Sequence, residues 1–60
     1  VVYAQYKHRE KELMVMFTRG ATYTYFDVPV YTWRGLQQAH SAGSFVSKHI
    51  RMKYEFKLAD

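Results

Sequence analysis

The chain has no cysteine, a single proline and three glycines among its 60 residues. Without cysteine it has no disulfide and no thiolate metal site, so apolar packing must stabilise it. No apolar run reaches the roughly 18 residues that a membrane-spanning helix needs. The N-terminus lacks a charged start followed by an apolar block, so we expect no signal peptide. The missing cysteine and signal together favour a cytoplasmic location.

Apolar residues make up 48% of the chain and aromatic residues 18%. A chain this short buries only about 60% of its unfolded surface. Large aromatic side chains bury about 150–250 Å² each, so a few of them build a small core. The length allows one domain, residues 1–60. The net charge of +4 permits an anionic partner such as RNA or DNA, but it also serves solubility alone.

Short runs of β-forming residues predict three strands, at residues 2–7, 12–18 and 21–26. A charged turn, residues 8–11, separates the first two. Arg-Gly at residues 19–20 forms a tight turn in which the glycine is free to adopt a positive φ. The three strands are therefore expected to form an antiparallel meander.

The spacing of apolar residues changes near residue 27 from the alternation of a strand to the period of a helix, and residues 29–40 are predicted to be helical. Pro29 suits the first turn, where its missing N–H loses no hydrogen bond, and Asp27 lies near the positive end of the helix. Gly35 costs up to about 1 kcal/mol relative to alanine, which close packing would explain. Some side chains recur at helical spacing and are expected to face the sheet: Trp33, Leu36 and Ala39 or His40.

A break at residues 41–43 precedes a second short helix at residues 44–50, with Ser44 as its N-cap. Alternation returns at residues 52–58 and predicts a closing strand. The fold class is therefore α+β: a small antiparallel sheet of about four strands packed on one face by two short helices.

Tyr23 and Tyr25 share one face of the third strand. Leu13, Val15 and Phe17 share a face of the second strand and must lie against the helices. The economical register places both tyrosines beside this trio, as core or rim packing. The alternative is an open sheet face on which the two rings stack with bases, and a slip of one residue would exchange the faces.

An ordered set of residues resembles the KTSC domain, a small family named for its presence at the C-terminus of some lysyl-tRNA synthetases. It also occurs alone in bacterial and phage proteins. The resemblance covers residues 1–58 and implies RNA binding by association with the synthetase. It is carried by Leu13, Val15, Phe17, Gly20, Tyr23, Tyr25, Val28, Pro29, Tyr31, Leu36, Ala39, Ser41, Gly43, Phe45, Ile50, Arg51 and Tyr54.

Basic residues suggest a nucleic-acid-binding surface that follows a phosphate backbone. Arg51 matches the family's Ile-Arg pair and presents a bidentate fork. The alternative is that these basic residues are ordinary solvated surface charges. For Arg51 alone, the alternative is a structural ion pair with Asp27 or another carboxylate. The predicted nucleic-acid-binding residues are Lys7, Arg9, Lys11, Lys48, Arg51, Lys53 and Lys57.

The opposite sheet face carries unexpected apolar side chains. Methionines stand at positions 14 and 16, where many members of the similar family have polar residues. Exposed methionine and aromatic groups often mark an adaptable contact surface. The other interpretations are that another part of the chain covers these side chains, or that they are simply exposed. The alternative function is therefore a protein-interaction module, a small phage or bacterial regulator that binds a host protein or itself. Its partner-binding residues are Tyr3, Met14, Met16 and Phe26.

The sequence gives little support to catalysis or metal binding. His8, His40 and His49 lack paired metal-ligand spacing. There is no glycine-rich phosphate loop and no paired-carboxylate motif, and serines near histidines in sequence do not make a triad. We therefore expect a non-catalytic binding module without a cofactor, without a metal and without a membrane partner.

Overall fold

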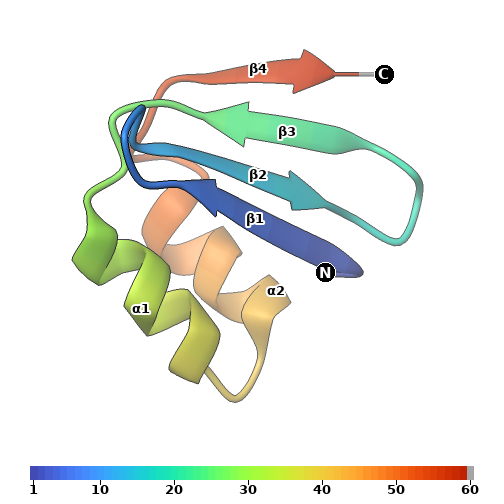
Figure 1. Ribbon diagram of the computed structural model, residues 1–60. Coiled ribbons are helices and arrows are strands. Elements are labelled where there is room, and N and C mark those ends of the chain that lie inside the picture. The colour runs from blue at the N-terminus through green and yellow to red at the C-terminus, as the bar shows by residue number, and fades with distance from the viewer. Residues whose placement is uncertain (60) are drawn as a thin grey trace.

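The polypeptide forms an antiparallel meander followed by two helical segments and a returning strand (Figure 1). The computed structural model describes residues 1–59. The strands lie side by side in the order β1-β2-β3-β4. Their bounds are Tyr3–Lys7 for β1, Glu12–Met16 for β2, Thr22–Tyr25 for β3 and Phe56–Ala59 for β4. The helical segments are α1, Val30–Gln38, then α2, Ala42–Phe45, and η1, a π-helical turn at Val46–Ile50.

The predicted α+β architecture is confirmed, with all four strands antiparallel to their neighbours. The first three strands are slightly shorter than predicted, because turns take over at their ends. The closing strand is the larger correction: it begins at Phe56 rather than at residue 52. Residues 51–54 continue the helical segment as turns, and the Lys53 N–H donates to the carbonyl of Ile50 at 3.1 Å.

Cross-strand register fixes which side chains share a face. Leu13 lies opposite Tyr25, and Val15 lies opposite Tyr23. Directly opposed residues point to the same side of a sheet, so both tyrosines lie on the face that carries the core. The core or rim interpretation of the tyrosine pair is thereby confirmed, with Tyr25 buried and Tyr23 half-buried.

The first helix begins after Pro29, which is its N-cap residue and has extended backbone angles, φ −68° and ψ 154°. Pro29 therefore precedes the first turn instead of lying within it, and Asp27 makes no cap. The side-chain predictions hold for Leu36, which is buried, and for Trp33, which is half-buried, whereas His40 is exposed.

The second helical segment starts two residues earlier than predicted. Ser41, not Ser44, is the N-cap of α2, and its side-chain oxygen accepts a hydrogen bond from the Ser44 N–H at 3.3 Å. α2 then runs directly into η1. The predicted break at residues 41–43 is thus a cap and the first turn of a helix.

One buried cluster joins the sheet to both helical segments. It consists of Tyr6, Leu13, Val15, Tyr25, Val28, Leu36, Val46 and Ile50. The Tyr6 hydroxyl donates a hydrogen bond to the Val28 carbonyl, and the Tyr6 ring stacks on Trp33 with centroids 5.6 Å apart. A second link joins the hydroxyls of Thr32 and Tyr54 at 3.1 Å. The Tyr6 contacts hold α1 and the loop before it against β1, and the Thr32–Tyr54 bond ties α1 to the segment before β4.

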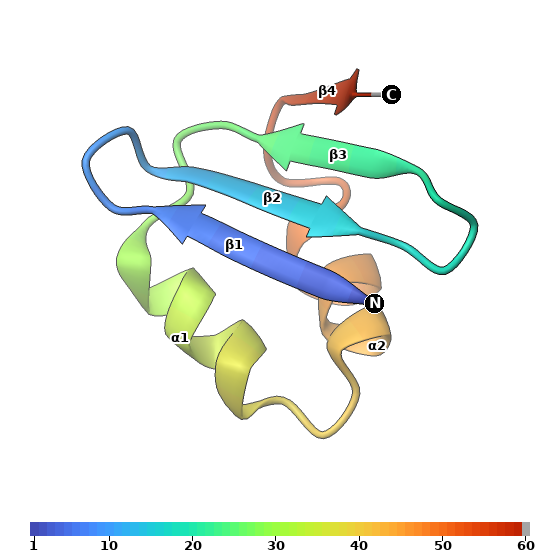
Figure 2. The same ribbon diagram turned by 45° about the vertical axis from the view of Figure 1, so that its right-hand side comes forward.

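Both helical segments lie on the same side of the sheet, and no other element of residues 1–59 covers the opposite face (Figure 2). The helices lie nearer to β1 and β2 than to β4 in both views (Figures 1 and 2). None of the helices within residues 1–59 has the length and hydrophobicity to cross a bilayer. The sheet is therefore wider than the helical layer that covers it.

Gly35 permits the close approach of α1 to α2. A Cβ atom built there would lie 2.9 Å from Cζ and 3.1 Å from Cε2 of Phe45. Such overpacking costs about 1–3 kcal/mol, partly offset by the roughly 1 kcal/mol that alanine gains over glycine in a helix. We expect Gly35→Ala to lower the free energy of unfolding by about 1 kcal/mol, or the Tm by about 4–8 °C.

Gly43→Ala is the matched control, since a Cβ atom there meets nothing within 4 Å and the residue is also helical. This change should raise the Tm or leave it unchanged in the same thermal melt. Equal effects of the two substitutions would contradict the close packing of Gly35 on Phe45.

Candidate functional site

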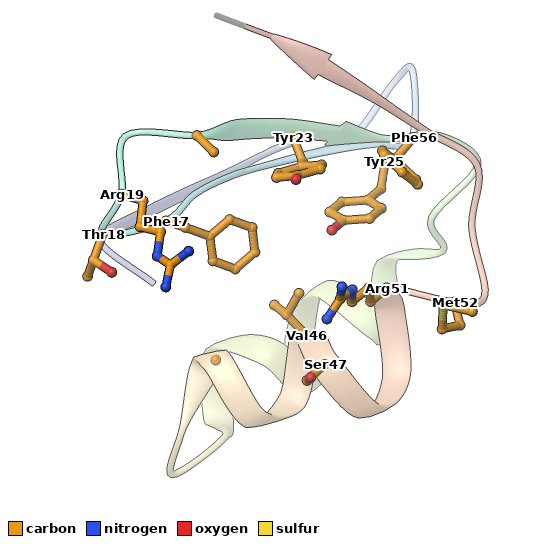
Figure 3. A pocket seen from close by; sticks show the side chains of 12 residues that line it. Phe17, Thr18, Arg19, Tyr23, Tyr25, Val46, Ser47, Arg51, Met52 and Phe56 are labelled. Atoms are coloured by element: carbon orange, nitrogen blue, oxygen red, sulfur yellow. The ribbon is translucent and has the colours of Figure 1, made fainter.

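A groove opens between β3 and the end of the helical layer (Figure 3). Its volume is about 540 Å³, which lies within the range of roughly 300–1,000 Å³ typical of small-ligand sites. The residues that line it come from the β2–β3 turn, β3, the α2–η1 segment and β4. They are Phe17, Thr18, Arg19, Ala21, Tyr23, Tyr25, Gly43, Val46, Ser47, Arg51, Met52 and Phe56.

The groove exists because the helical layer ends before the sheet does. Phe56 and Leu58 lie opposite Tyr25 and Tyr23, so they point to the helix side. Even so, they are 53% and 55% exposed. Met52, at the groove's edge, is 90% exposed. Apolar side chains on the covered side of the sheet are thus left open to solvent along β4.

Four aromatic rings form one continuous wall of the groove. Phe17 meets Tyr23 edge to face, with centroids 5.6 Å apart. The Tyr23 and Tyr25 rings are nearly parallel, at 6.2 Å and 18°. Phe56 contacts both of them, at 5.4 Å from Tyr23 and 5.9 Å from Tyr25. Each ring is held by its neighbours, so the wall offers preorganised π-faces to a ligand.

Two arginines stand at opposite ends of this wall (Figure 3). Arg19 belongs to the turn that precedes β3, and Arg51 follows η1 near the other end of the same strand. Among residues 1–59 the lining includes no aspartate or glutamate. The groove therefore combines an apolar centre with positive charge at each end, which favours a ligand that carries negative charge beside a flat apolar group.

The π-helical turn η1 fixes the position of Arg51. The Arg51 N–H donates to the carbonyl of Val46 at 2.8 Å, closing the wide turn. Val46 and Ile50 in the same turn are buried in the core. Because π-turns inside helices frequently occur at functional sites, this anchoring is consistent with a binding role for Arg51. No side-chain hydrogen bond joins Arg51 to Asp27 among residues 1–59.

The Tyr25 hydroxyl is the most enclosed polar group of the groove. The residue is only 2% exposed, and within residues 1–59 its hydroxyl has no hydrogen-bond partner. It is not sealed off, because every fully enclosed side-chain oxygen or nitrogen in that part of the chain is hydrogen-bonded. The hydroxyl therefore opens into the groove, toward the side where Arg51 lies (Figure 3).

Electrostatics agree with this placement. Burial raises the pKa of the Tyr25 hydroxyl, and the neighbouring Tyr23 raises the same pKa further, whereas the Arg51 guanidinium lowers it. The tyrosine thus stays protonated, as a hydrogen-bond donor, at neutral pH and somewhat above. A protonated hydroxyl next to a guanidinium is a donor pair suited to an anionic oxygen.

The predicted basic residues do not gather on one face. Arg51 lines the groove, and Lys48 lies in the preceding turn η1 on the helix side. Lys57 pairs with Thr24 on the outer face of the sheet, and Lys7 lies on that face as well. Three others occupy turns near the end of the sheet where β1 ends and β4 begins: Arg9, Lys11 and Lys53.

The predicted partner-binding residues lie together on the outer face, with one exception. Tyr3 pairs with Met16, and Met14 pairs with Gln5 on one side and Thr24 on the other. Both methionines are half-buried and Tyr3 is 49% exposed. Phe26 follows the end of β3 in a bend, where its N–H donates to the carbonyl of Glu55 at 2.9 Å.

The sequence analysis missed Arg19 as a site residue. It placed this residue correctly in a turn but gave it no binding role. The signal that could have found it is position, since Arg19 precedes a strand whose Tyr23 and Tyr25 share the helix-facing side. Phe17 was assigned to a strand face, but its part in a groove could be recognised only from the extent of the helices.

The fold and the site define a small α+β domain with an open aromatic groove. The family model of the KTSC domain matches residues 1–54. The chain belongs to the KTSC domain family. All of the groove residues except Phe56 lie inside the matched segment.

Two similar proteins support this assignment. A protein of Tsukamurella paurometabola is 37% identical over 51 residues, which span 85% of this chain and 76% of that protein. The crystal structure of a KTSC domain protein from Yersinia pestis superposes with a TM-score of 0.91. That match covers 95% of this chain and 80% of the other at 24% identity, so it speaks for the fold alone.

Burial of tyrosine makes stability fall in alkali. Burial raises the pKa of Tyr6 and of Tyr25 above the ordinary 10.0. The folded state therefore holds these protons more tightly, so their contribution is complete below pH 10 and is lost as pH rises through the folded-state pKa values. We expect the urea midpoint to decline above that pH.

Tyr25→Phe should make this decline shallower and cost little at neutral pH, because the Tyr25 hydroxyl has no partner among residues 1–59. Tyr31→Phe is the control, since Tyr31 is 73% exposed and lies outside the groove. An unchanged alkaline slope in the Tyr25 variant would contradict its raised pKa.

Proposed function

We propose that this protein is a non-catalytic module that binds single-stranded nucleic acid, RNA in particular, in the aromatic groove. The observation that carries the proposal is a wall of four aromatic rings with an arginine at each end. Within the described part of the chain, residues 1–59, no carboxylate side chain lines it. Nucleic-acid strands match this pattern because each base offers a flat π-face and each link carries a phosphate.

The aromatic wall would supply affinity through stacking. Stacking of one base on an aromatic side chain contributes about 1–3 kcal/mol and tolerates any base sequence. Phe56, at the β4 edge, is the exposed ring of the four, whereas Phe17 and Tyr23 are half-buried. Tyr25 is too enclosed to stack and offers its hydroxyl instead.

The arginines would supply the electrostatic part. Each phosphate contact with a single strand contributes about −0.7 to the slope of log affinity against log salt. Contacts from Arg19 and Arg51 alone predict a slope of about −1.4. Affinity would then fall about sevenfold between 50 and 200 mM salt. Lys48, in the turn beside Arg51, would steepen the slope if it also meets a phosphate.

The direct test compares Arg51→Gln with Arg34→Gln, which removes the same charge from the exposed face of α1, outside the groove. The ligand is a single-stranded RNA of about ten nucleotides, titrated by fluorescence anisotropy at both salt concentrations. We expect the Arg51 variant to lose about tenfold in affinity and to flatten the salt slope by about 0.7. The Arg34 variant should retain both.

Phe17→Leu tests the stacking part, since it removes a ring face and keeps an apolar side chain. We expect affinity to drop at both salt concentrations with the salt slope unchanged. Equal losses in the Arg34 and Arg51 variants would assign the binding to overall charge and overturn the groove as its site. Tighter binding to single-stranded DNA than to RNA would correct the substrate.

A second candidate function rests on the bare outer face of the sheet (Figure 2). Met14 and Met16 lie side by side with Tyr3 there, and no other element within residues 1–59 covers them. We propose protein interaction, including self-association, as the alternative use of this domain. An apolar centre with a polar rim is the usual composition of such contacts.

The alternative is tested by a paired substitution, Met14→Ser with Met16→Ser, in sedimentation velocity over a range of protein concentrations. We expect a concentration-dependent dimer of the natural chain to become a monomer, with RNA affinity retained. Arg51→Gln is the control and should keep the dimer. A natural chain that stays monomeric throughout would rule out self-association through this face.

Three expectations from the sequence stay predictions. They are the lack of catalytic activity, the cytoplasmic location, and binding through the more distant basic residues, such as Arg9 and Lys53. An RNA footprint on the protein by amide exchange would decide the last of these, because the groove predicts protection of β3 and η1 rather than of the β1–β2 turn.

A further inference from the structure

We propose that the Arg51 end of the groove is a phosphate subsite, formed by the hydroxyls of Tyr25 and Tyr23 and by the Arg51 guanidinium. The inference rests on the proposed function, because it names the part of the strand held at this end. It also assigns different roles to the two ends of the groove, with phosphate at Arg51 and base stacking toward Phe17.

The burial of Tyr25 is the first argument. A side chain that is only 2% exposed normally has its polar atom paired. Within residues 1–59 the Tyr25 hydroxyl has no partner, yet it opens to the groove. It is therefore a donor on a ring held in the core, and it faces the space that a ligand would fill (Figure 3).

Two tyrosine hydroxyls and one guanidinium line this end of the groove. The parallel stacking of Tyr23 on Tyr25 holds the two rings 6.2 Å apart, and both hydroxyls face the groove (Figure 3). Arg51 lines the groove from the helical side (Figure 3). A guanidinium and two O–H groups suit phosphate, whose several oxygens accept from different directions. A carboxylate presents two acceptor oxygens in one plane, whereas a phosphate presents its oxygens in a tetrahedral arrangement.

The charge pattern is the third argument. None of the lining residues that the structure describes carries a carboxylate that would compete for Arg51. Burial raises the pKa of the Tyr25 hydroxyl, and the Arg51 guanidinium lowers the same pKa by a smaller amount. An anion bound between them would be held by a permanent charge on one side and by neutral donors on the other.

The test uses Tyr25→Phe, which removes a single oxygen and keeps the ring in the core. Inorganic phosphate is titrated by NMR, observing the Arg51 Nε–H and the amides of η1. We expect the natural chain to show saturable shifts, and Tyr25→Phe and Arg51→Gln each to weaken binding about tenfold or more. Tyr31→Phe and Arg34→Gln are the controls and should bind as the natural chain does. Unchanged phosphate affinity in Tyr25→Phe would overturn the subsite, as would equal binding of acetate.

RNA titrations separate this inference from the proposed function and identify the source of the phosphate. If Phe17→Leu weakens RNA binding but Tyr25→Phe does not, the groove binds RNA and the subsite is wrong. If phosphate binding depends on Tyr25 and RNA fails to bind, the subsite stands and the proposed function is wrong. Preference for a 5′-phosphorylated strand would assign a terminal phosphate. Equal affinity for both strands, weakened equally by Tyr25→Phe, would assign an internal phosphodiester, and both results support the subsite.

Discussion

The burial of one face of β2 is the constraint on which the rest of the structure depends. Leu13 and Val15 on this central strand are fully enclosed, so the helical layer must lie beneath them. In a chain of 60 residues that layer consists of α1 and the α2–η1 segment, and it ends before β4. The groove lies on the part of the same face that the helices leave uncovered. Its aromatic wall is therefore made of side chains that also pack in or against the core, such as Tyr25 and Tyr23.

Most of the fold could be predicted from the sequence, because period and turn chemistry are local. Alternation around Leu13 and Val15 predicted the core face, and Gly20 adopts the positive φ of 86° that its turn requires. The misplaced features depend on context. Ser41 and Ser44 are both good caps, and only the entry angle of the chain decides between them. The late start of β4 reflects helical turns that continue past Ile50.

The site was only partly predictable. Tyr23 and Tyr25 were recognised as the informative pair, but packing and ligand contact were treated as alternatives. In the structure the Tyr25 ring fills the core while its hydroxyl opens to the groove, so packing does not exclude the proposed ligand contact. Arg51 was proposed from its resemblance to a family motif. That Arg51 lines the same groove as Arg19 could not be predicted, because it depends on how far the helices extend under the sheet.

The strand that closes the groove is also an edge strand. Phe56 contributes to the wall, whereas β4 pairs only with β3. Edge strands open locally at a lower free energy than the whole domain unfolds. A ligand that touches Phe56 would therefore hold β4 in place, and a well-paired β4 would tighten binding by the same factor. Opening of β4 and binding of a ligand in the groove are thus thermodynamically coupled, and each disfavours the other.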